Sequence, residues 1–220
     1  MEDVLNKKMH GCTVRILQDE GFSDSPEQWG DESLFLVGFH RDFSVERKGF
    51  EAYVAAQAYA DRDKYKDLDE AQQARVKEVK KQYHIFGLEA YIHSGVVLAL
   101  SKEGSFPDRA WDVSQLGAVF VAKKDWPTKI KARNAAWSLV RTWNDCLSGN
   151  VYGFIVEDSS GDQIESVWGY IGDYDTSGCL AEAEATAKLH EEEQLKKQVA
   201  KIKAYTKSKV PLDKRKAFRV

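Results

Sequence analysis

Residues 91–121 constrain the fold more than any other part of the chain. They include two short apolar runs, 96–100 and 116–122, on either side of a loop rich in Gly, Pro and Asp. Apolar runs of this length bounded by turn formers are typical of sheet strands. Polar and aromatic residues gather near the ends of these runs, in Tyr91-Ile92-His93-Ser94-Gly95 and in Trp111-Asp112 followed by Gln115. The segment therefore predicts neighbouring strands whose ends present candidate functional side chains.

Further strands are predicted on both sides of this segment. Residues 12–19 alternate apolar and polar positions, which is the period of a strand with one solvated face. Residues 34–40 are almost all apolar, as in a strand buried within a sheet. Residues 151–157 and 163–170 are joined by Asp158-Ser159-Ser160-Gly161-Asp162, which predicts a β-hairpin.

Three regions have the character of helices. Residues 127–147 place apolar side chains at helical spacing, residues 50–84 predict a charged helical insertion, and a long helix begins near Cys179 and continues past Tyr205. Hairpins outnumber strand-helix-strand units. We therefore predict an α+β fold, with a mixed or largely antiparallel sheet of about six or seven strands packed by helices and with a long C-terminal helix.

The predicted organisation is a globular α+β domain over residues 1–178, the long helix over residues 179–206 and a basic tail over residues 207–220. In the long helix, acidic residues precede basic ones, an order that complements the helix dipole. The apolar stripe of this helix is imperfect. Its second half could therefore project from the body and serve as a surface for self-association.

Charge and composition exclude several classes of protein. The net charge is −3, but residues 201–220 alone carry +7, which leaves −10 on the first 200 residues. An acidic body argues against nucleic-acid binding by the whole protein, although the tail could contact phosphate. Its candidate residues are Lys207, Lys209, Lys214, Arg215 and Lys216.

No apolar run approaches the roughly 20 residues that a membrane helix needs, and the first residues lack the pattern of a secretory signal. We therefore expect no membrane association and a cytoplasmic location.

Three scattered cysteines, Cys12, Cys146 and Cys179, predict neither a disulfide framework nor a zinc site. Neither a phosphate-binding loop nor another cofactor motif is recognised, so no cofactor is expected.

One candidate constellation is catalytic. His40, His93, Asp112 and Asp173 supply imidazole and carboxylate groups, which suit general acid–base chemistry or a metal ion. None of them has the spacing of a known ligand motif. The structural alternative is that His93 and Asp112 hydrogen-bond the backbone in tight turns. Ser94 adjoins His93, but neighbouring strand residues point to opposite faces, so a Ser–His nucleophile is not predicted.

A second constellation is aromatic and suits binding. Trp111 and Tyr174 lie in polar loops and are the aromatic residues we expect to be exposed, whereas Trp168 is expected in the core. The candidate binding residues are Trp111, Gln115, Ser94, Tyr174, Arg41 and Asp173.

Six short motifs along residues 13–175 resemble a family of uncharacterised proteins encoded by bacteriophages and prophages. They are Ser25-Pro26-Glu27-Gln28-Trp29, Phe39-His40-Arg41, Tyr91-Ile92-His93-Ser94-Gly95, Trp111-Asp112 with Gln115-Leu116-Gly117, Gly149-Asn150-Val151-Tyr152-Gly153-Phe154 and Val167-Trp168-Gly169-Tyr170-Ile171-Gly172. The chain departs from the family pattern at Ile92, where the family usually has Asp, and at Val113-Ser114, where it has Ser-Gly.

The resemblance implies a phage accessory protein without an established activity. We expect it to bind a host macromolecule, such as a host protein of defence or other machinery that it inhibits. Two alternatives stay open: a small metal-assisted or hydrolytic enzyme centred on His93 and Asp112, and nucleic-acid binding through the basic tail. Ile92 weakens the enzymatic alternative if the family's Asp is a ligand or base.

Overall fold

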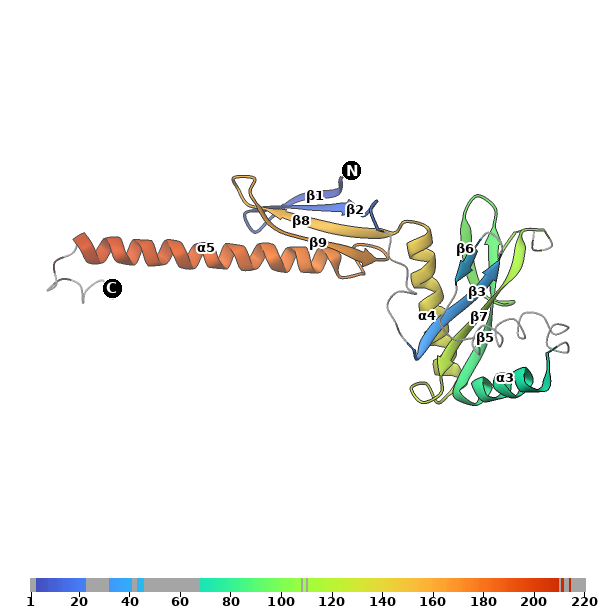
Figure 1. Cartoon of the computed structure of the whole chain (residues 1–220). Coiled ribbons are helices and arrows are strands. Elements are labelled where there is room, and N and C mark those ends of the chain that lie inside the picture. The colour runs from blue at the N-terminus through green and yellow to red at the C-terminus, as the bar shows by residue number, and fades with distance from the viewer. Residues whose placement is uncertain are drawn as a thin grey trace. The chain divides into compact units, whose positions relative to one another are not determined.

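A computed structural model describes residues 3–22, 32–40, 43–45, 68–107, 109, 111–209, 211 and 214, with the backbone alone for 39–40 and 43–45. The chain divides into two compact units (Figure 1). Unit 1 combines residues 1–21 with residues 151–220, and unit 2 is the continuous segment 22–150. Each unit has its own antiparallel sheet.

Unit 2 contains a five-stranded sheet in the order β4-β3-β7-β5-β6. All its strand pairs are antiparallel. Its strands are β3 (Leu34–His40), β4 (Phe43–Val45), β5 (Tyr83–Ile92), β6 (Val96–Leu100) and β7 (Val113–Ala122). The close approach of β3 to β7 requires a glycine, because a Cβ on Gly117 would lie 1.9 Å from the carbonyl oxygen of Val37.

Two helices pack on this sheet. Helix α4 (Lys129–Leu147) begins at the cap residue Thr128 and buries Val140 and Trp143 in a cluster with strand residues such as Leu88. Helix α3 (Glu70–Gln82) begins with a capping box at Asp69 and buries Val76 and Val79 in a second cluster, which holds the stacked rings of Phe35 and Phe120. Neighbouring strand residues alternate between these two clusters, as the strand period requires.

Unit 1 contains a four-stranded sheet in the order β1-β2-β8-β9. Its strands are β1 (Asp3–Met9), β2 (Cys12–Gln18), β8 (Val151–Glu157) and β9 (Gln163–Ile171). Helix α5 (Cys179–Lys209) buries Cys179, Ala183 and Ala187 against this sheet, where Ile16 and Phe154 are fully buried. The second half of α5 extends beyond the sheet of its own unit (Figure 1).

The structure confirms the predicted α+β class, the antiparallel pairing and the long C-terminal helix. The strands form two sheets of four and five strands, whereas one sheet of six or seven was expected. The hairpin at residues 158–162 is present, with Gly161 at a positive φ of 88°. The first part of the charged insertion, residues 50–67, lies outside the described residues. The predicted domain boundaries at 178 and 206 stay a prediction.

None of the helices in the described ranges is long and apolar enough to cross a membrane.

Candidate functional site

The candidate site lies in unit 2, where strands β5, β6 and β7 end together. The pairing of Tyr91 with both Val97 and Val113 brings the turn at residues 93–95 next to the end of the loop that enters β7. The amide of Ile92 donates to the carbonyl oxygen of Asp112 over 3.1 Å. We call the connection between β6 and β7 the 101–112 loop; its residues 108 and 110 lie outside the described part.

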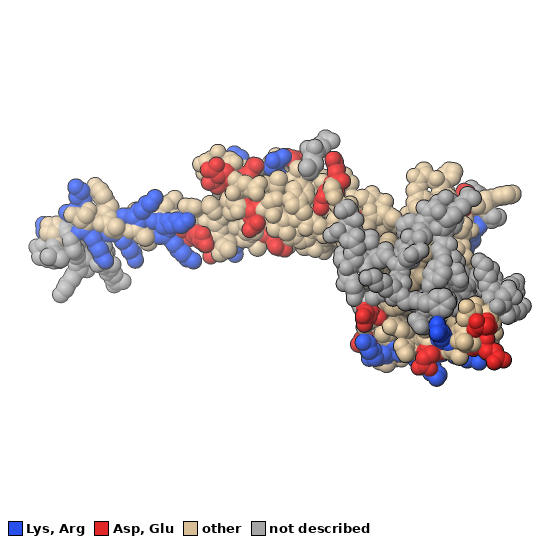
Figure 2. All heavy atoms as spheres, viewed as in Figure 1, with Lys and Arg blue, Asp and Glu red and all other residues tan. Residues whose placement is uncertain are grey.

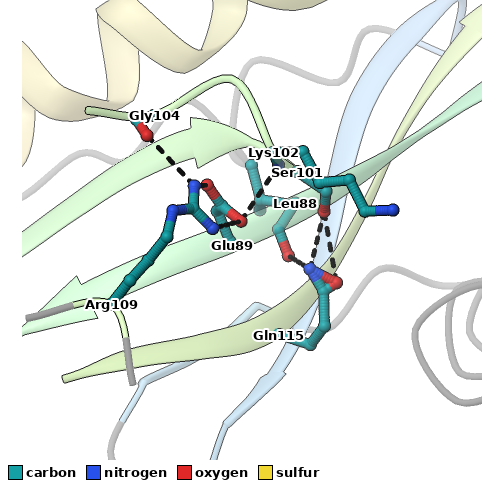
Figure 3. A network of polar contacts seen from close by, with 7 residues as sticks. All are labelled: Leu88, Glu89, Ser101, Lys102, Gly104, Arg109 and Gln115. Carbon is teal, nitrogen blue, oxygen red and sulfur yellow. Dashed lines mark hydrogen bonds and ion pairs between the residues drawn. The ribbon is translucent and has the colours of Figure 1, made fainter. Parts of the chain in front are cut away.

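A buried carboxylate holds the 101–112 loop on the sheet. Glu89 of β5 is only 3% exposed, although its neighbours Leu88 and Ala90 belong to the apolar cluster under α4. Its carboxylate accepts hydrogen bonds from both terminal nitrogens of Arg109 and from the amide of Lys102, the latter over 3.1 Å (Figure 3). Such two-pronged, charge-assisted contacts are the strong kind of hydrogen bond.

Arg109 completes the closure of the loop. Its Nη2 also donates to the carbonyl oxygen of Gly104 over 3.0 Å (Figure 3). The hydrogen bond to Glu89 raises the pKa of Arg109 above its usual value, which favours the charged guanidinium. The loop is thus fixed at two points by an arginine that is itself partly exposed.

A second pair of contacts ties the loop to helix α4. Glu103 accepts from Arg133 Nε over 3.0 Å, from Arg133 Nη2 over 2.8 Å and from Trp137 Nε1 over 2.6 Å. The hydrogen bond from Arg133 lowers the pKa of Glu103, and the one from Trp137 adds to this shift. The loop is therefore anchored both on β5 and on α4.

The inside of the 101–112 loop is tightly packed around Gly104 and Phe106. A Cβ on Gly104 would lie 2.8 Å from the Cβ of Ala99 and 2.5 Å from the ring of Phe106. The Phe106 ring stacks on Tyr91 with centroids 5.6 Å apart, and the Arg109 guanidinium lies 6.0 Å from the Phe106 centroid. These contacts give the loop a defined conformation.

Trp111 is the outstanding exposed side chain of this loop. It is 88% exposed, which agrees with the prediction that it faces solvent. It lies two residues after Arg109 and two before the start of β7. A large apolar side chain is therefore presented to solvent between two fixed points of the backbone.

His93 and Asp112 lie close to each other, as the catalytic hypothesis requires, but they form only a loose pair. The distance from His93 Nδ1 to Asp112 Oδ2 is 3.9 Å, and 69% of the His93 side chain is exposed. The amide of His93 donates to the carbonyl oxygen of Gly95 over 3.2 Å, which closes the turn that also holds Ser94. This arrangement resembles the structural alternative, in which these residues stabilise two turns.

Gln115 has a local role that the sequence did not reveal. Its Nε2 donates to Ser101 Oγ over 2.6 Å and to the carbonyl oxygen of Leu88 over 3.5 Å (Figure 3). Gln115 pairs with Glu89 across the strands, at a β-bulge. The Gln115 side chain thereby links Ser101, just after β6, to strand β5, whose Glu89 holds the 101–112 loop.

The remaining predicted site residues either belong to unit 1 or have side chains outside the described part of the chain. His40 pairs with Phe43 through the backbone, and its side chain lies outside the described part, as does Arg41. Asp173 and Tyr174 belong to unit 1. Asp173 Oδ1 accepts from the amide of Asp175 over 2.9 Å and so stabilises the turn before α5.

Two expectations about aromatic exposure are wrong. Tyr174 is half-buried and packs edge-on against Tyr152, with centroids 5.7 Å apart, because its loop folds back on β8. Trp168 is 38% exposed and was expected in the core. Its Nε1 donates to Ser166 Oγ over 2.9 Å, and its ring packs on Gly153 of β8, where a Cβ would lie 2.2 Å from the ring.

Unit 1 contains a polar cleft of about 460 Å³ between its hairpin turns and α5. His10 Nδ1 lies 3.2 Å from Glu191 Oε2, and His10 Nε2 lies 3.7 Å from Glu184 Oε1. Asp158 and His190 also line the cleft. Sequence reasoning missed this cleft because its residues come from three distant parts of the chain.

Thiol chemistry is not favoured in this cleft. Burial raises the pKa of the Cys12 thiol, and the nearby carboxylates of Asp158 and Glu191 raise it further. A thiol in such surroundings stays protonated and is a weak nucleophile. Across the residues that the structure describes, no three His, Cys, Asp or Glu side chains are grouped so that they could hold a metal ion.

No protein-family model matches the chain, and no similar curated protein or solved structure was found. The resemblance to phage-encoded proteins therefore stays a prediction.

Proposed function

We propose that this protein acts by binding a macromolecular partner through the surface around Trp111. The observation that carries the proposal is the 88% exposure of Trp111 on a loop whose backbone is fixed by Glu89 and Arg109. Tryptophan is among the residues that most often dominate interface energetics. A loop backbone that is ordered before binding loses less conformational entropy when a partner covers it.

The geometry favours binding over catalysis at this end of the sheet. A direct hydrogen bond between His93 and Asp112 needs a heavy-atom distance of about 2.6–3.2 Å. The observed distance is 3.9 Å, and His93 is largely exposed to water. The electrostatic stabilisation that catalysis uses is strongest where water is excluded.

The expected partner is a protein of a bacterial host, and the expected effect is inhibition of that partner in the host cytoplasm. This part of the proposal depends on the resemblance to phage-encoded proteins. The exposed Trp111 supports the choice of a protein as partner, since aromatic residues are enriched at protein–protein interfaces.

Site-specific photocrosslinking tests the proposal. A photoreactive phenylalanine analogue replaces Trp111 in one variant and Ile130 in another, and each is irradiated in host lysate. Ile130 is the matched control because it is 78% exposed on helix α4 of the same unit. We expect one defined crosslinked protein from position 111 and none from position 130.

The purified crosslinked protein then permits a quantitative test. Trp111→Ala should weaken its binding by roughly 30-fold or more, the loss of at least about 2 kcal/mol that defines a hot spot. Ile130→Ala should leave the affinity unchanged, and both variants should keep the melting temperature of the parent. Equal binding by Trp111→Ala and the parent would refute a role for this surface.

A further inference from the structure

The second half of α5 carries a concentrated positive charge. Residues 194–209 contain six lysines and no Asp or Glu, whereas the net charge of the whole chain is −3. All six lysines are exposed to solvent. Figure 2 shows basic side chains towards the C-terminal end of α5, with acidic side chains nearer the sheet of unit 1. The segment is therefore a strongly basic surface on an otherwise acidic chain.

Four of these lysines lack a neutralising carboxylate in the described part of the chain. No ion pair joins Lys196, Lys197, Lys201 or Lys203 to an Asp or Glu there. Lys197 and Lys201 are four residues apart, a spacing at which like charges on a helix destabilise it. A polyanion in contact with this segment relieves that repulsion.

The lysines form two rows on one side of the helix. At about 3.6 residues per turn, all of them except Lys209 fall within about 160° of the helix circumference. The strip between the rows contains the small side chains of Ala200 and Ala204. The rows are Lys196-Lys203-Lys207 and Lys197-Lys201. We call these five lysines and two alanines the basic face.

We propose that the basic face binds double-stranded DNA by entering the major groove. An α-helix with its side chains is about 10–12 Å across, and the major groove of B-DNA is about 12 Å wide. The small Ala200 and Ala204 let the helix approach the floor of the groove, and the two lysine rows then reach the phosphates of the strands on either side. The rows span about 16 Å of helix, a length over which a duplex carries roughly ten phosphate charges. Each of the five lysines can therefore pair with a phosphate.

An anionic membrane is the competing partner for a basic helix, and the other side of α5 disfavours it. Helices that lie in a membrane interface bury a face rich in Leu, Phe and Trp. The side of α5 opposite the two alanines contains only aliphatic apolar residues, interrupted by Gln198 and Lys209. These aliphatic residues are Leu195, Val199 and Ile202. The charge pattern therefore favours DNA over lipid.

Salt dependence tests the phosphate contacts. The parent protein is titrated into a fluorescent DNA duplex of about two helical turns, and anisotropy is measured between about 50 and 200 mM salt. Five phosphate contacts predict a slope of about −4.5 when the logarithm of the association constant is plotted against the logarithm of the salt concentration. Absence of binding at the lowest salt concentration would overturn the proposal. Binding to phosphatidylserine vesicles but not to the duplex would assign the basic face to a membrane instead.

Paired substitutions test the basic face itself. Lys197→Gln with Lys203→Gln removes one lysine from each row, whereas Lys188→Gln with Lys209→Gln removes the same charge from the other side of α5. The first pair should weaken duplex binding by about tenfold or more at about 0.1 M salt and make the slope shallower by about 1.8, because each phosphate contact contributes about 0.9. The control pair should change both quantities far less. Glutamine keeps a good helix propensity, and circular dichroism checks that α5 persists. Equal losses in the two pairs would reflect net charge alone and would overturn the proposal.

The kind of duplex tests docking in the groove. An RNA duplex of the same sequence carries similar phosphate charge, but its A-form major groove is deep and narrow. The protein should therefore bind the DNA duplex more tightly than the RNA duplex by about tenfold or more. Equal affinities would contradict docking in the major groove. The basic face belongs to unit 1 and Trp111 to unit 2, so DNA binding and crosslinking from position 111 are measured independently.

Discussion

Glu89→Gln tests whether the buried carboxylate fixes the 101–112 loop. The substitution preserves the shape of the side chain but removes its negative charge. It also turns an amide NH2 group towards the Arg109 guanidinium, and both of these groups can only donate hydrogen bonds. Hydrogen bonds to charged groups contribute about 1.5–3 kcal/mol each. Arg109 is 43% exposed on its side chain and can be hydrated once released, and a neutral amide is easier to bury than a carboxylate.

Hydration of the released Arg109 and easier burial of the amide offset part of the lost hydrogen bonding. We therefore expect Glu89→Gln to lower the free energy of unfolding by about 2 kcal/mol, near the lower end of that range. In a protein of this size it corresponds to a fall in melting temperature of roughly 4–8 °C. The loop should also open more often. Trypsin cleavage after Arg109 should accelerate by up to about 30-fold, since each 1.4 kcal/mol changes an equilibrium tenfold.

Glu78→Gln is the matched control, because it removes an exposed ion pair with Lys81 on helix α3 of the same unit. It should change neither the melting temperature nor the cleavage after Arg109 appreciably. Differential scanning calorimetry and timed proteolysis followed by mass spectrometry provide the two measurements. An unchanged melting temperature and an unchanged cleavage rate in Glu89→Gln would refute the role assigned to the carboxylate.

Three further predictions concern packing, anchoring and thiol reactivity. Gly104→Ala should destabilise unit 2 by about 1–3 kcal/mol in urea unfolding, because the added Cβ meets Ala99 and Phe106. Asn144→Ala should lower the free energy of unfolding by about 1–2 kcal/mol, because the Asn144 side chain hydrogen-bonds the amide and the carbonyl oxygen of Leu98 over 2.8 and 2.9 Å. Thr142→Ala, on the same helix, is the control and should lower it less. Burial raises the pKa of the Cys146 and Cys179 thiols to about 11. At pH 8 they should therefore react with iodoacetamide roughly a hundredfold more slowly in the native protein than in denaturant.

Local sequence patterns were sufficient to predict most of the elements. The hairpin at Asp158-Ser159-Ser160-Gly161-Asp162 and the helix after Pro127 follow from turn and capping chemistry that acts over a few residues. Strand β1 was missed because its Asn6, Lys7 and Lys8 give no apolar alternation; it is an edge strand and is largely exposed.

The division into two sheets could not be deduced from the sequence. It depends on the pairing of β2 with β8, which joins Thr13 to Glu157 across most of the chain. Periodicity describes which face of a strand is buried but not which strand lies beside it. The continuous unit 2 is inserted between these two partners, and no composition shift marks its borders.

The candidate site was predicted in part. Trp111 was identified because it lies in a polar loop, where a tryptophan is expected to face solvent. Glu89 and Arg109 were missed because they are 20 residues apart and neither belongs to a motif. A signal was present, since a glutamate between Leu88 and Ala90 in an apolar strand needs a partner if it is buried.

The most direct test of the central claim is the comparison of photocrosslinking from positions 111 and 130 in host lysate. Both side chains are highly exposed in the same unit, so they sample solvent similarly and differ mainly in their surroundings. A defined product from position 111 alone is the predicted result. Identical products from both positions, or none from position 111 in a correctly folded protein, would contradict the proposal that Trp111 marks a binding surface.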